Sequence, residues 1–311
     1  MRVPYVTVDV FTDRPFGGNP LAVFPDARRI PEALLQPIAG ELNLSETVFV
    51  FPAETPQGTR RARIFTPSAE LPFAGHPTVG TAFMLVHRGD VPSGDEGTTV
   101  VLEEGVGLVS VRVDGATESQ RRATFTAAQL PEEGPQDVAA EELAAIVGLE
   151  ASDLAPAPWR PRSFSAGVPF LHIPLASLEA LSRARLDSGR WQQLADSWAS
   201  QLYLVVPPGL DGDPSSIRVR MFAPGLGVPE DPATGSAATA LAGYLAATTP
   251  FHGSRSWVVL QGQEIGRPSE IHLEVEGQGS VVSQIKVGGT CVPMAEAWLE
   301  IPDRLVESLN A

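Results

Sequence analysis

The chain has 311 residues, of which 43% are apolar, so it is long enough to bury a large core and to form two domains. Acidic residues outnumber basic ones by 37 to 22, and a net charge of -15 disfavours binding to nucleic acid or to anionic membranes. With Cys291 as its single cysteine, the chain can form no intramolecular disulfide and no thiolate metal cluster, and catalysis by two thiols is excluded.

Common signatures of metal and nucleotide sites are also missing from the sequence. The 5 histidines show no HExxH or HxxEH spacing, and there is neither a P-loop nor a strand-linked GxGxxG. The N-terminal run MRVPYVTVDVF reads as a strand and lacks the regions of a signal peptide, and no stretch reaches about 18 uninterrupted apolar residues. We therefore expect a cytoplasmic protein that needs no metal or cofactor and does not enter a membrane.

Periodic patterns along the chain predict a mixture of helices and antiparallel strands. Helical spacing of apolar residues occurs at residues 31–42, 140–149 and 188–199. Alternating apolar and polar residues between glycine-rich turns predict strands and hairpins, in order, at residues 98–115, 123–128, 256–266, 269–277 and 279–289. This composition of elements favours an α+β protein.

The chain contains an internal repeat. RARIFTPSAELP, at residues 61–72, aligns with RVRMFAPGLGVP, at residues 218–229, at a constant offset of 157. The identical positions are Arg61 and Arg218, Arg63 and Arg220, Phe65 and Phe222, Pro67 and Pro224, and Pro72 and Pro229. A weaker echo lies upstream, where GNPLAVF at residues 18–24 resembles GVPFLHI at residues 167–173. We infer two similar halves.

Each repeat is followed by a glycine-containing turn and a helix of small residues. The runs AGHPTVGTAFMLVH and EDPATGSAATALAGYLA have no polar face, which predicts buried helices. If a pseudo-twofold axis relates the halves, both helix N-termini point into one cleft, where their unpaired N–H groups can bind an anion. Gly75, His76, Gly235 and Ser236 lie at these ends, and Ser236 is a plausible N-cap. Taken singly, each turn is better explained as an ordinary tight turn, but the match between turns in two duplicated halves favours the anion site.

The boundary between the halves is predicted at LPEEGP, from Leu130 to Pro135, because this stretch has little pattern. We expect an N-terminal domain at residues 1–130 and a C-terminal domain at residues 131–294. The final segment, residues 295–311, can pack back on either domain, and we group it with the first.

Three side chains are candidates for acid–base chemistry, although none is persuasive alone. Glu46, in LNLSETVF, precedes a β-rich run, and a carboxylate there is often part of a loop or a solvated strand end. His76 alone is typical of a hydrogen-bonded structural histidine, and Asp231 precedes Pro232, where it can cap the following helix.

Four motifs taken together resemble the phenazine-biosynthesis PhzF-like family, whose relatives are diaminopimelate epimerase and proline racemase. They are VDVFTDRPFGGNPLAVF, LNLSETVFV, FTPSAELPFAGHPTVGTA and EDPATGSAATAL, in the family's order from near the N-terminus to about residue 242. The resemblance implies two pseudo-symmetric domains, each a sheet or barrel wrapped around a central buried helix, with the active site in the interdomain cleft. It also implies an isomerase, usually a homodimer, that acts on a small-molecule carboxylate without metal or cofactor.

The resemblance further implies roles for individual residues. Glu46 is the catalytic acid and base, assisted by His76 and Asp231. The residues implied to contact the substrate are Asn19, Gly75, His76, Gly235 and Ser236, with Asn19 supported only by its place in GGNP.

The related epimerases and racemases use two cysteines on opposite faces of the substrate carbon. Those positions fall near Ala74 and Thr234 here, and neither side chain can remove a proton from carbon. A single carboxylate can instead move a proton between two carbons on one face. The resemblance therefore predicts allylic double-bond isomerisation of a small cyclic or unsaturated carboxylic acid, with burial raising the pKa of Glu46.

Two other functions stay open. One is a non-catalytic ligand-binding or scaffold protein on the same fold, because a fold does not dictate a function. The other is a serine hydrolase built from Ser236, His76 and Asp231, which is disfavoured because the chain lacks the GxSxG elbow.

Overall fold

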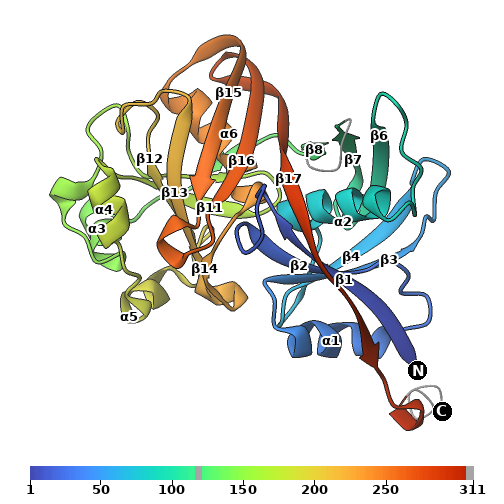
Figure 1. Ribbon diagram of the computed structural model, residues 1–311. Coiled ribbons are helices and arrows are strands. Elements are labelled where there is room, and N and C mark those ends of the chain that lie inside the picture. Colours follow the sequence, from blue (N-terminus) through green and yellow to red (C-terminus); the bar gives the residue numbers. More distant parts are fainter. Residues whose placement is uncertain (116–120, 306–311) are drawn as a thin grey trace. The chain divides into compact units, whose positions relative to one another are not determined.

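The computed structural model describes residues 1–115 and 121–305, and Figure 1 shows its course. The chain forms two compact units: unit 1 contains residues 1–128 and 288–311, and unit 2 contains residues 129–287. The divisions lie at Ala128 and Gly288, where the sequence had suggested residues 130 and 294. Residues 306–311 of the C-terminal segment lie outside the described residues. Within the described residues, no helix combines the length and apolarity needed to cross a membrane.

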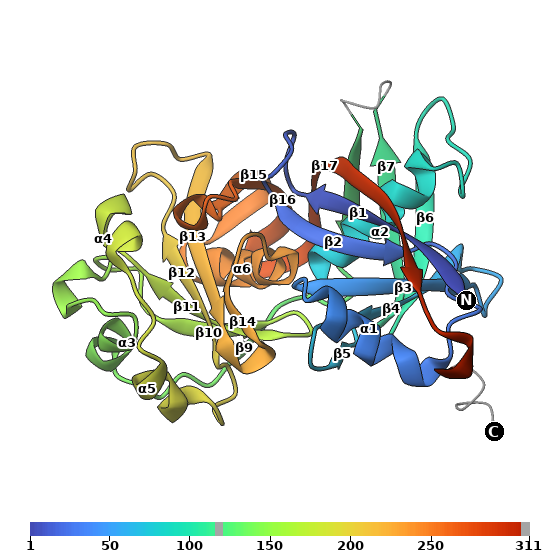
Figure 2. The ribbon, with the colours of Figure 1, turned by 60° about the horizontal axis from the view of Figure 1, so that its bottom comes forward.

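Unit 1 is a mixed sheet with one buried helix and one peripheral helix (Figures 1 and 2). Its strands are β1 (Arg2–Val10), β2 (Asn19–Phe24), β3 (Glu46–Pro52), β4 (Arg60–Phe65), β5 (Glu70–Leu71), β6 (Thr98–Glu104), β7 (Gly107–Asp114) and β8 (Arg122–Thr126), with the last part of β17 (Val281–Glu300). Its helices are η1 (Glu32–Leu34), α1 (Leu35–Leu42) and α2 (Gly75–His87).

The strand order of unit 1 follows from its pairings. β1 lies between β2 and β17 and is antiparallel to both. β2 is parallel to β3, β3 is antiparallel to β4, and β4 is parallel to β6. Two antiparallel pairings then join β6 to β7 and β7 to β8.

Helix α2 is the centre of unit 1. Every residue from Gly75 to Val86 is buried, and the helix contacts β1, β2, β3, β6, β7 and β8. This confirms the prediction of a buried helix, which was based on its lack of a polar face. Gly80 permits the close approach, since a Cβ atom there would lie 2.7 Å from side-chain atoms of both Val10 and Leu21. A separate apolar cluster joins the peripheral α1 to β2 and β3.

Unit 2 repeats this plan with more peripheral helices. Its strands are β9 (Glu132–Gly134), β10 (Arg162–Ser165), β11 (Pro169–Pro174), β12 (Gln201–Val206), β13 (Ser216–Ala223), β14 (Val228–Asp231), β15 (Phe251–Gln261), β16 (Ser269–Gly279) and the first part of β17. Its α-helices are α3 (Ala140–Ile146), α4 (Leu178–Arg183), α5 (Ser188–Trp191) and α6 (Gly235–Thr248). Its short 3-10 helices are η3 (Ala151–Asp153), η4 (Gln192–Leu194), η5 (Pro224–Leu226) and η6 (Gln263–Ile265).

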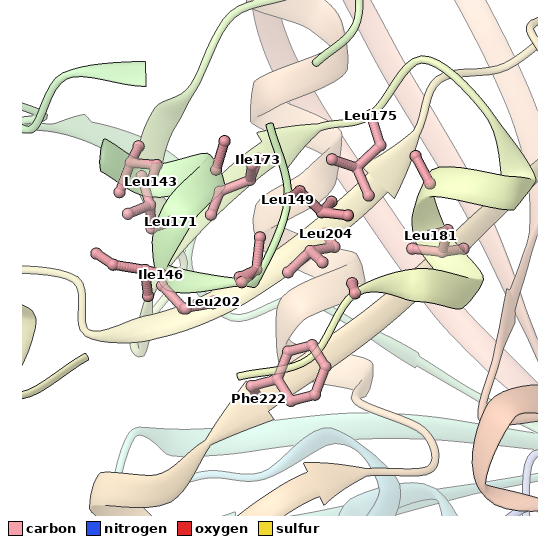
Figure 3. Close-up of a cluster of buried hydrophobic side chains, with 14 of the residues drawn as sticks. Leu143, Ile146, Leu149, Leu171, Ile173, Leu175, Leu181, Leu202, Leu204 and Phe222 are labelled. Atoms are coloured by element: carbon pink, nitrogen blue, oxygen red, sulfur yellow. The ribbon is translucent and has the colours of Figure 1, made fainter. Parts of the chain in front are cut away.

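The core of unit 2 has two layers separated by the sheet. Alternate residues of β11 and β12 pack against α3 and α4 in the cluster drawn in Figure 3, where Leu171 and Leu202 are labelled. The intervening residues face the other way, towards α6. There the ring of His172 stacks on Tyr244 of α6 at 5.0 Å and meets Tyr203 edge-on at 5.7 Å. Helix α6 is buried from Gly235 to Ala246, which confirms its prediction as well.

The weakly patterned segment Leu130 to Pro135 contains a short strand, β9, which pairs with β10. One detail of the predicted elements is wrong. The helix predicted at residues 188–199 is only α5 followed by η4. In its last part the Ser197 hydroxyl, which has one hydrogen to donate, lies 2.7 Å from the carbonyl oxygen of Leu194 and 3.1 Å from that of Ala199, and side-chain bonds of this kind compete with helix formation.

Strand registers extend the internal repeat and correct one of its pairs. Arg63 binds Glu70 through two guanidinium nitrogens, at 2.7 and 2.8 Å, and Arg220 binds Glu230 in the same way, at 2.8 Å each. Ile64 pairs with Leu71 in unit 1, and its counterpart Met221 pairs with Asp231 in unit 2. The loop before β14 is therefore longer than the loop before β5, so the counterpart of Pro72 is Pro232 and not Pro229.

Candidate active site

In unit 1, three of the predicted residues meet where two strands and a helix begin. Asn19 is the first residue of β2, Glu46 is the first residue of β3, and His76 is the second residue of α2. Because β2 and β3 are parallel, their first residues lie at the same edge of the sheet. The Asn19 amide Nδ2 lies 3.2 Å from His76 Nδ1, and His76 Nε2 lies 3.1 Å from Glu46 Oε2.

His76 is electrically neutral. Its side chain is 3% exposed, and burial lowers the pKa of its imidazole to about 3. Since the amide nitrogen of Asn19 donates to Nδ1, the ring proton resides on Nε2, the atom that faces Glu46. The ring nitrogen and the carboxylate are in close contact without the alignment of a hydrogen bond. The Glu46 carboxylate, 13% exposed, is thus shielded from most solvent and lies against the neutral imidazole ring.

The N-terminus of α2 borders this cluster. Its N-cap residue is Ala74, in an extended conformation, and no side chain caps the helix. The first turn also contains no acidic residue. The N–H groups from Gly75 onward therefore lack a side-chain acceptor, which is the arrangement that binds anions at helix N-termini.

Unit 2 gathers its predicted residues at the N-terminus of α6. Asp231 ends β14, and its Oδ2 accepts a hydrogen bond of 2.6 Å from Thr234 Oγ1. Gln261, the last residue of β15, donates through Nε2 to the Asp231 carbonyl oxygen at 2.7 Å and to Thr234 Oγ1 at 2.9 Å. Gly235 is the first residue of α6 and Ser236 the second.

The structure contradicts the prediction that Ser236 caps α6. The helix begins two residues earlier than a serine cap requires, so the N-cap is Thr234. The Thr234 hydroxyl donates to Asp231 instead of capping the helix, and no side chain caps this N-terminus either. Both buried helices thus begin with backbone N–H groups that no side-chain cap satisfies.

The two registers identify the counterpart of Glu46 in unit 2. Leu21 of β2 is opposite Glu46, and Phe170 of β11 is opposite Gln201. The next pair agrees, because Thr47 is opposite Phe65 and Leu202 is opposite Phe222, its repeat partner. The position that holds a carboxylate in unit 1 therefore holds an amide in unit 2.

Neither Gln201 nor Gln261 lies in a recognisable motif, so their roles could not be predicted from the sequence. The signal that identifies them is the internal repeat combined with strand pairing. Each glutamine follows from the register between two strands whose counterparts in unit 1 are established by the repeat. The cysteine-equivalent positions Ala74 and Thr234 both prove to be N-cap residues. Cys291, on β17, is buried, and burial raises the pKa of its thiol well above the ordinary range, so it is a poor nucleophile.

These units have the fold of the epimerases and racemases. A hydroxyproline epimerase from Agrobacterium vitis, 12% identical, superposes with a TM-score of 0.65 over 96% of this chain and 91% of that one, a likeness of fold alone. A PhzF-family phenazine biosynthesis protein from Bacillus anthracis is closer, with a TM-score of 0.85, 26% identity, and coverage of 97% and 100%.

Sequence comparison then gives the family. The model of the phenazine biosynthesis-like proteins, PhzC-PhzF, matches residues 8–297. An uncharacterised isomerase from Mesorhizobium japonicum is 41% identical, with coverage of 96% of this chain and 98% of the relative. The trans-2,3-dihydro-3-hydroxyanthranilate isomerase of Pseudomonas aeruginosa is 35% identical, with coverage of 94% and 97%. The chain belongs to the phenazine biosynthesis-like (PhzC-PhzF) family.

Proposed function

We propose that this isomerase moves a proton between two carbons of a small cyclic or unsaturated carboxylic acid, with Glu46 as its single acid and base. The observation that carries the proposal is the contact of the Glu46 carboxylate with a buried, neutral His76 whose ring is fixed by Asn19. A neutral imidazole holds the carboxylate in place without neutralising it, so the carboxylate remains able to accept a proton.

The reaction has two steps. The Glu46 carboxylate removes a proton from a carbon next to the double bond, and the electron pair of the broken C–H bond shifts the double bond by one position. Glu46, now a carboxylic acid, returns the proton to the far carbon, which restores the carboxylate and leaves atoms and charge balanced. Because one group gives back the proton it took, donor and acceptor carbons present the same face.

The difference between the units supports one base over two. A racemase-like inversion needs a second base on the opposite face of the carbon. The counterpart of Glu46 is Gln201, whose amide cannot accept the proton, and Ala74 and Thr234 stand at the positions of the related cysteines.

Substrate binding is assigned to the helix N-termini. In unit 1, Gly75 offers uncapped backbone N–H groups to a substrate carboxylate, and each helix end contributes roughly half a positive charge. In unit 2, we assign the same role to Gly235 and Ser236, with Asp231 as a hydrogen-bonding partner of the substrate. The serine hydrolase reading loses support, because Asp231 accepts from Thr234 while the ring nitrogens of His76 face Asn19 and Glu46.

The test uses trans-2,3-dihydro-3-hydroxyanthranilate, the compound named for the Pseudomonas relative, together with other small unsaturated cyclic carboxylic acids. Proton NMR in D2O follows both the shift of the double bond and the uptake of deuterium at carbon. We expect Glu46→Gln to lower turnover by about 10²- to 10⁴-fold, since it keeps the shape of the side chain and removes its basicity.

Glu41→Gln, an exposed carboxylate on α1, is the matched control and should leave turnover unchanged. Near-normal turnover in the Glu46→Gln variant would refute the assignment of the base. If the wild-type protein binds these acids tightly but causes no uptake of deuterium at their carbons, it is a ligand-binding protein.

A further inference from the structure

Glu104, at the end of β6, is a buried carboxyl group that the proposed reaction does not use. The repeat identifies its counterpart, because β6 runs parallel to β4 as β15 runs parallel to β13. Arg61 is opposite Glu103, and its repeat partner Arg218 is opposite Leu260. The next residues along the two strands, Glu104 and Gln261, therefore occupy equivalent positions.

Both side chains bind the start of the buried helix of their own unit. Gln261 is fully buried and makes hydrogen bonds to Asp231 and Thr234, as described above. Glu104, 9% exposed, binds through Oε1 to the hydroxyl of Thr78, at 2.8 Å. The same hydroxyl lies 2.8 Å from the carbonyl oxygen of Ala74, the N-cap residue of α2. In each unit, a buried polar side chain from the equivalent strand position thus anchors the start of the helix.

The hydrogen atoms available to Glu104, the Thr78 hydroxyl and the Ala74 carbonyl oxygen indicate that Glu104 is neutral. The Thr78 hydroxyl has one hydrogen, and the Ala74 carbonyl can only accept, so a second proton is needed for both contacts to be hydrogen bonds. A carboxylic acid at Glu104 supplies that proton. The acid then matches the Gln261 amide, which is also a neutral donor.

Among the described residues, the charges around Glu104 offer no counter-ion. The titratable groups that share its pocket wall, from β4, β5, β6 and the β3–β4 loop, are Glu54, Arg61, Arg63, Glu70 and Glu103. The two arginines already bind carboxylates, Arg61 that of Glu54 and Arg63 that of Glu70. On β7 the residue opposite Glu104 is Gly107, and the titratable group in the first turn of α2 is the neutral His76. Burial without a counter-ion raises the pKa of Glu104 to about 8.

We propose that Glu104 is a positioning residue, which as a neutral acid holds Thr78 and Ala74 and so fixes the turn of α2 that presents Gly75 and His76. The inference rests on the proposed function only in taking this turn to be part of the active site. Ionisation of Glu104 removes the proton that it donates, so the single hydrogen of the Thr78 hydroxyl can no longer serve both the carboxylate and the Ala74 carbonyl oxygen. The turn is therefore held correctly below the pKa of Glu104 and loosened above it.

The first experiment needs no substrate. In the wild-type protein, infrared spectra should show the carbonyl band of a buried neutral carboxyl group that disappears with a midpoint near pH 8. NMR spectra should show the backbone amides of Gly75 and His76 titrating with the same midpoint. In Glu104→Gln, which supplies a permanent neutral donor as Gln261 does, the band should be absent and the amide signals independent of pH in this range.

Glu103→Gln is the matched control, since it removes the neighbouring carboxylate, whose bonds go to Glu54 and Thr55. It should keep the wild-type titration. The proposal is overturned if the wild-type protein lacks the neutral carboxyl band at pH 6, or if the amides of Gly75 and His76 titrate identically in wild type and Glu104→Gln. The infrared measurement on wild type settles the protonation state even if the variant fails to fold.

Stability gives a second readout. The folded state holds its proton up to about pH 8, whereas an unfolded glutamate releases it near pH 4.5, so raising the pH between these values favours unfolding. Relative to Glu104→Gln, the unfolding constant of the wild type should rise by about tenfold per pH unit in this window. Parallel curves would contradict a neutral Glu104.

Activity separates this inference from the proposed function. If Glu46→Gln keeps full turnover while the amides titrate as expected, the function is wrong and the positioning role stands. We expect wild-type kcat to fall as the pH rises through the pKa of Glu104. If Glu46→Gln is inactive but this fall persists unchanged in Glu104→Gln, the positioning role is wrong.

Discussion

The repeated arginine–glutamate pair gives a matched test of how burial changes the value of an ion pair. Arg220 is 4% exposed and makes two hydrogen bonds to Glu230 and one each to the carbonyl oxygens of Leu181 and Ala184. Arg220→Met leaves a largely buried carboxylate and two carbonyl groups without their donor. Breaking a buried pair in this way costs about 3–5 kcal/mol of folding free energy.

Its counterpart Arg63 makes the same bidentate contact, but Arg63 and its partners are more exposed to solvent. Arg63 is 17% exposed, and its partners Glu70 and Glu32 are 43% and 81% exposed. Pairs of this kind are worth about 0–1 kcal/mol, so Arg63→Met should cost several-fold less than Arg220→Met.

Urea denaturation followed by circular dichroism measures both losses in one buffer. The double variant Arg220→Met/Glu230→Leu is the control, because removing both charges also removes the stranded carboxylate and should recover much of the loss. Equal losses for the two single variants, or no recovery in the double variant, would refute the reasoning.

Two further predictions concern packing and pH. Gly80→Ala should destabilise the protein by about 1–3 kcal/mol, since the new Cβ atom would crowd Val10 and Leu21. The control Gly40→Ala should raise the free energy of unfolding by about 0.5–1 kcal/mol, because its Cβ atom would meet only a carbonyl oxygen at 3.4 Å. A stabilised Gly80→Ala in thermal unfolding would show that the helix has room to move. Burial lowers the pKa of His172 to about 3, so its contribution to stability is present above pH 6.5 and is lost as the pH falls below that value. In the wild type, the free energy of unfolding should therefore fall by about 1.4 kcal/mol per pH unit between pH 6.5 and pH 4 because of His172, and His172→Phe should remove this fall. An equally steep fall in the variant would contradict the reasoning.

Features encoded within short segments were the ones that sequence could predict. The two buried helices follow from small-residue runs without a polar face, and the glycine turns before them follow from local composition. The family motifs named Asn19, Glu46 and His76, and the structure brings these three together within unit 1.

Features that depend on strand pairing were out of reach. Glu104 and Gln201 lie in no motif. Their equivalence to residues of the other unit follows from the strand registers of the sheet. The role of Ser236 was misjudged for a similar reason. Where α6 begins depends on Thr234, whose hydroxyl is fixed by Asp231 and Gln261, and a sequence pattern does not show those contacts.

Strand β17 has a consequence for how the protein is made. It runs unbroken from Val281 in unit 2 to Glu300 in unit 1, where it pairs with β1 along the whole length of that strand. On the ribosome, β1 emerges first but lacks this partner until nearly the whole chain has been synthesised. Unit 2 can close while unit 1 still has an open edge, so the N-terminal unit is completed after the C-terminal one.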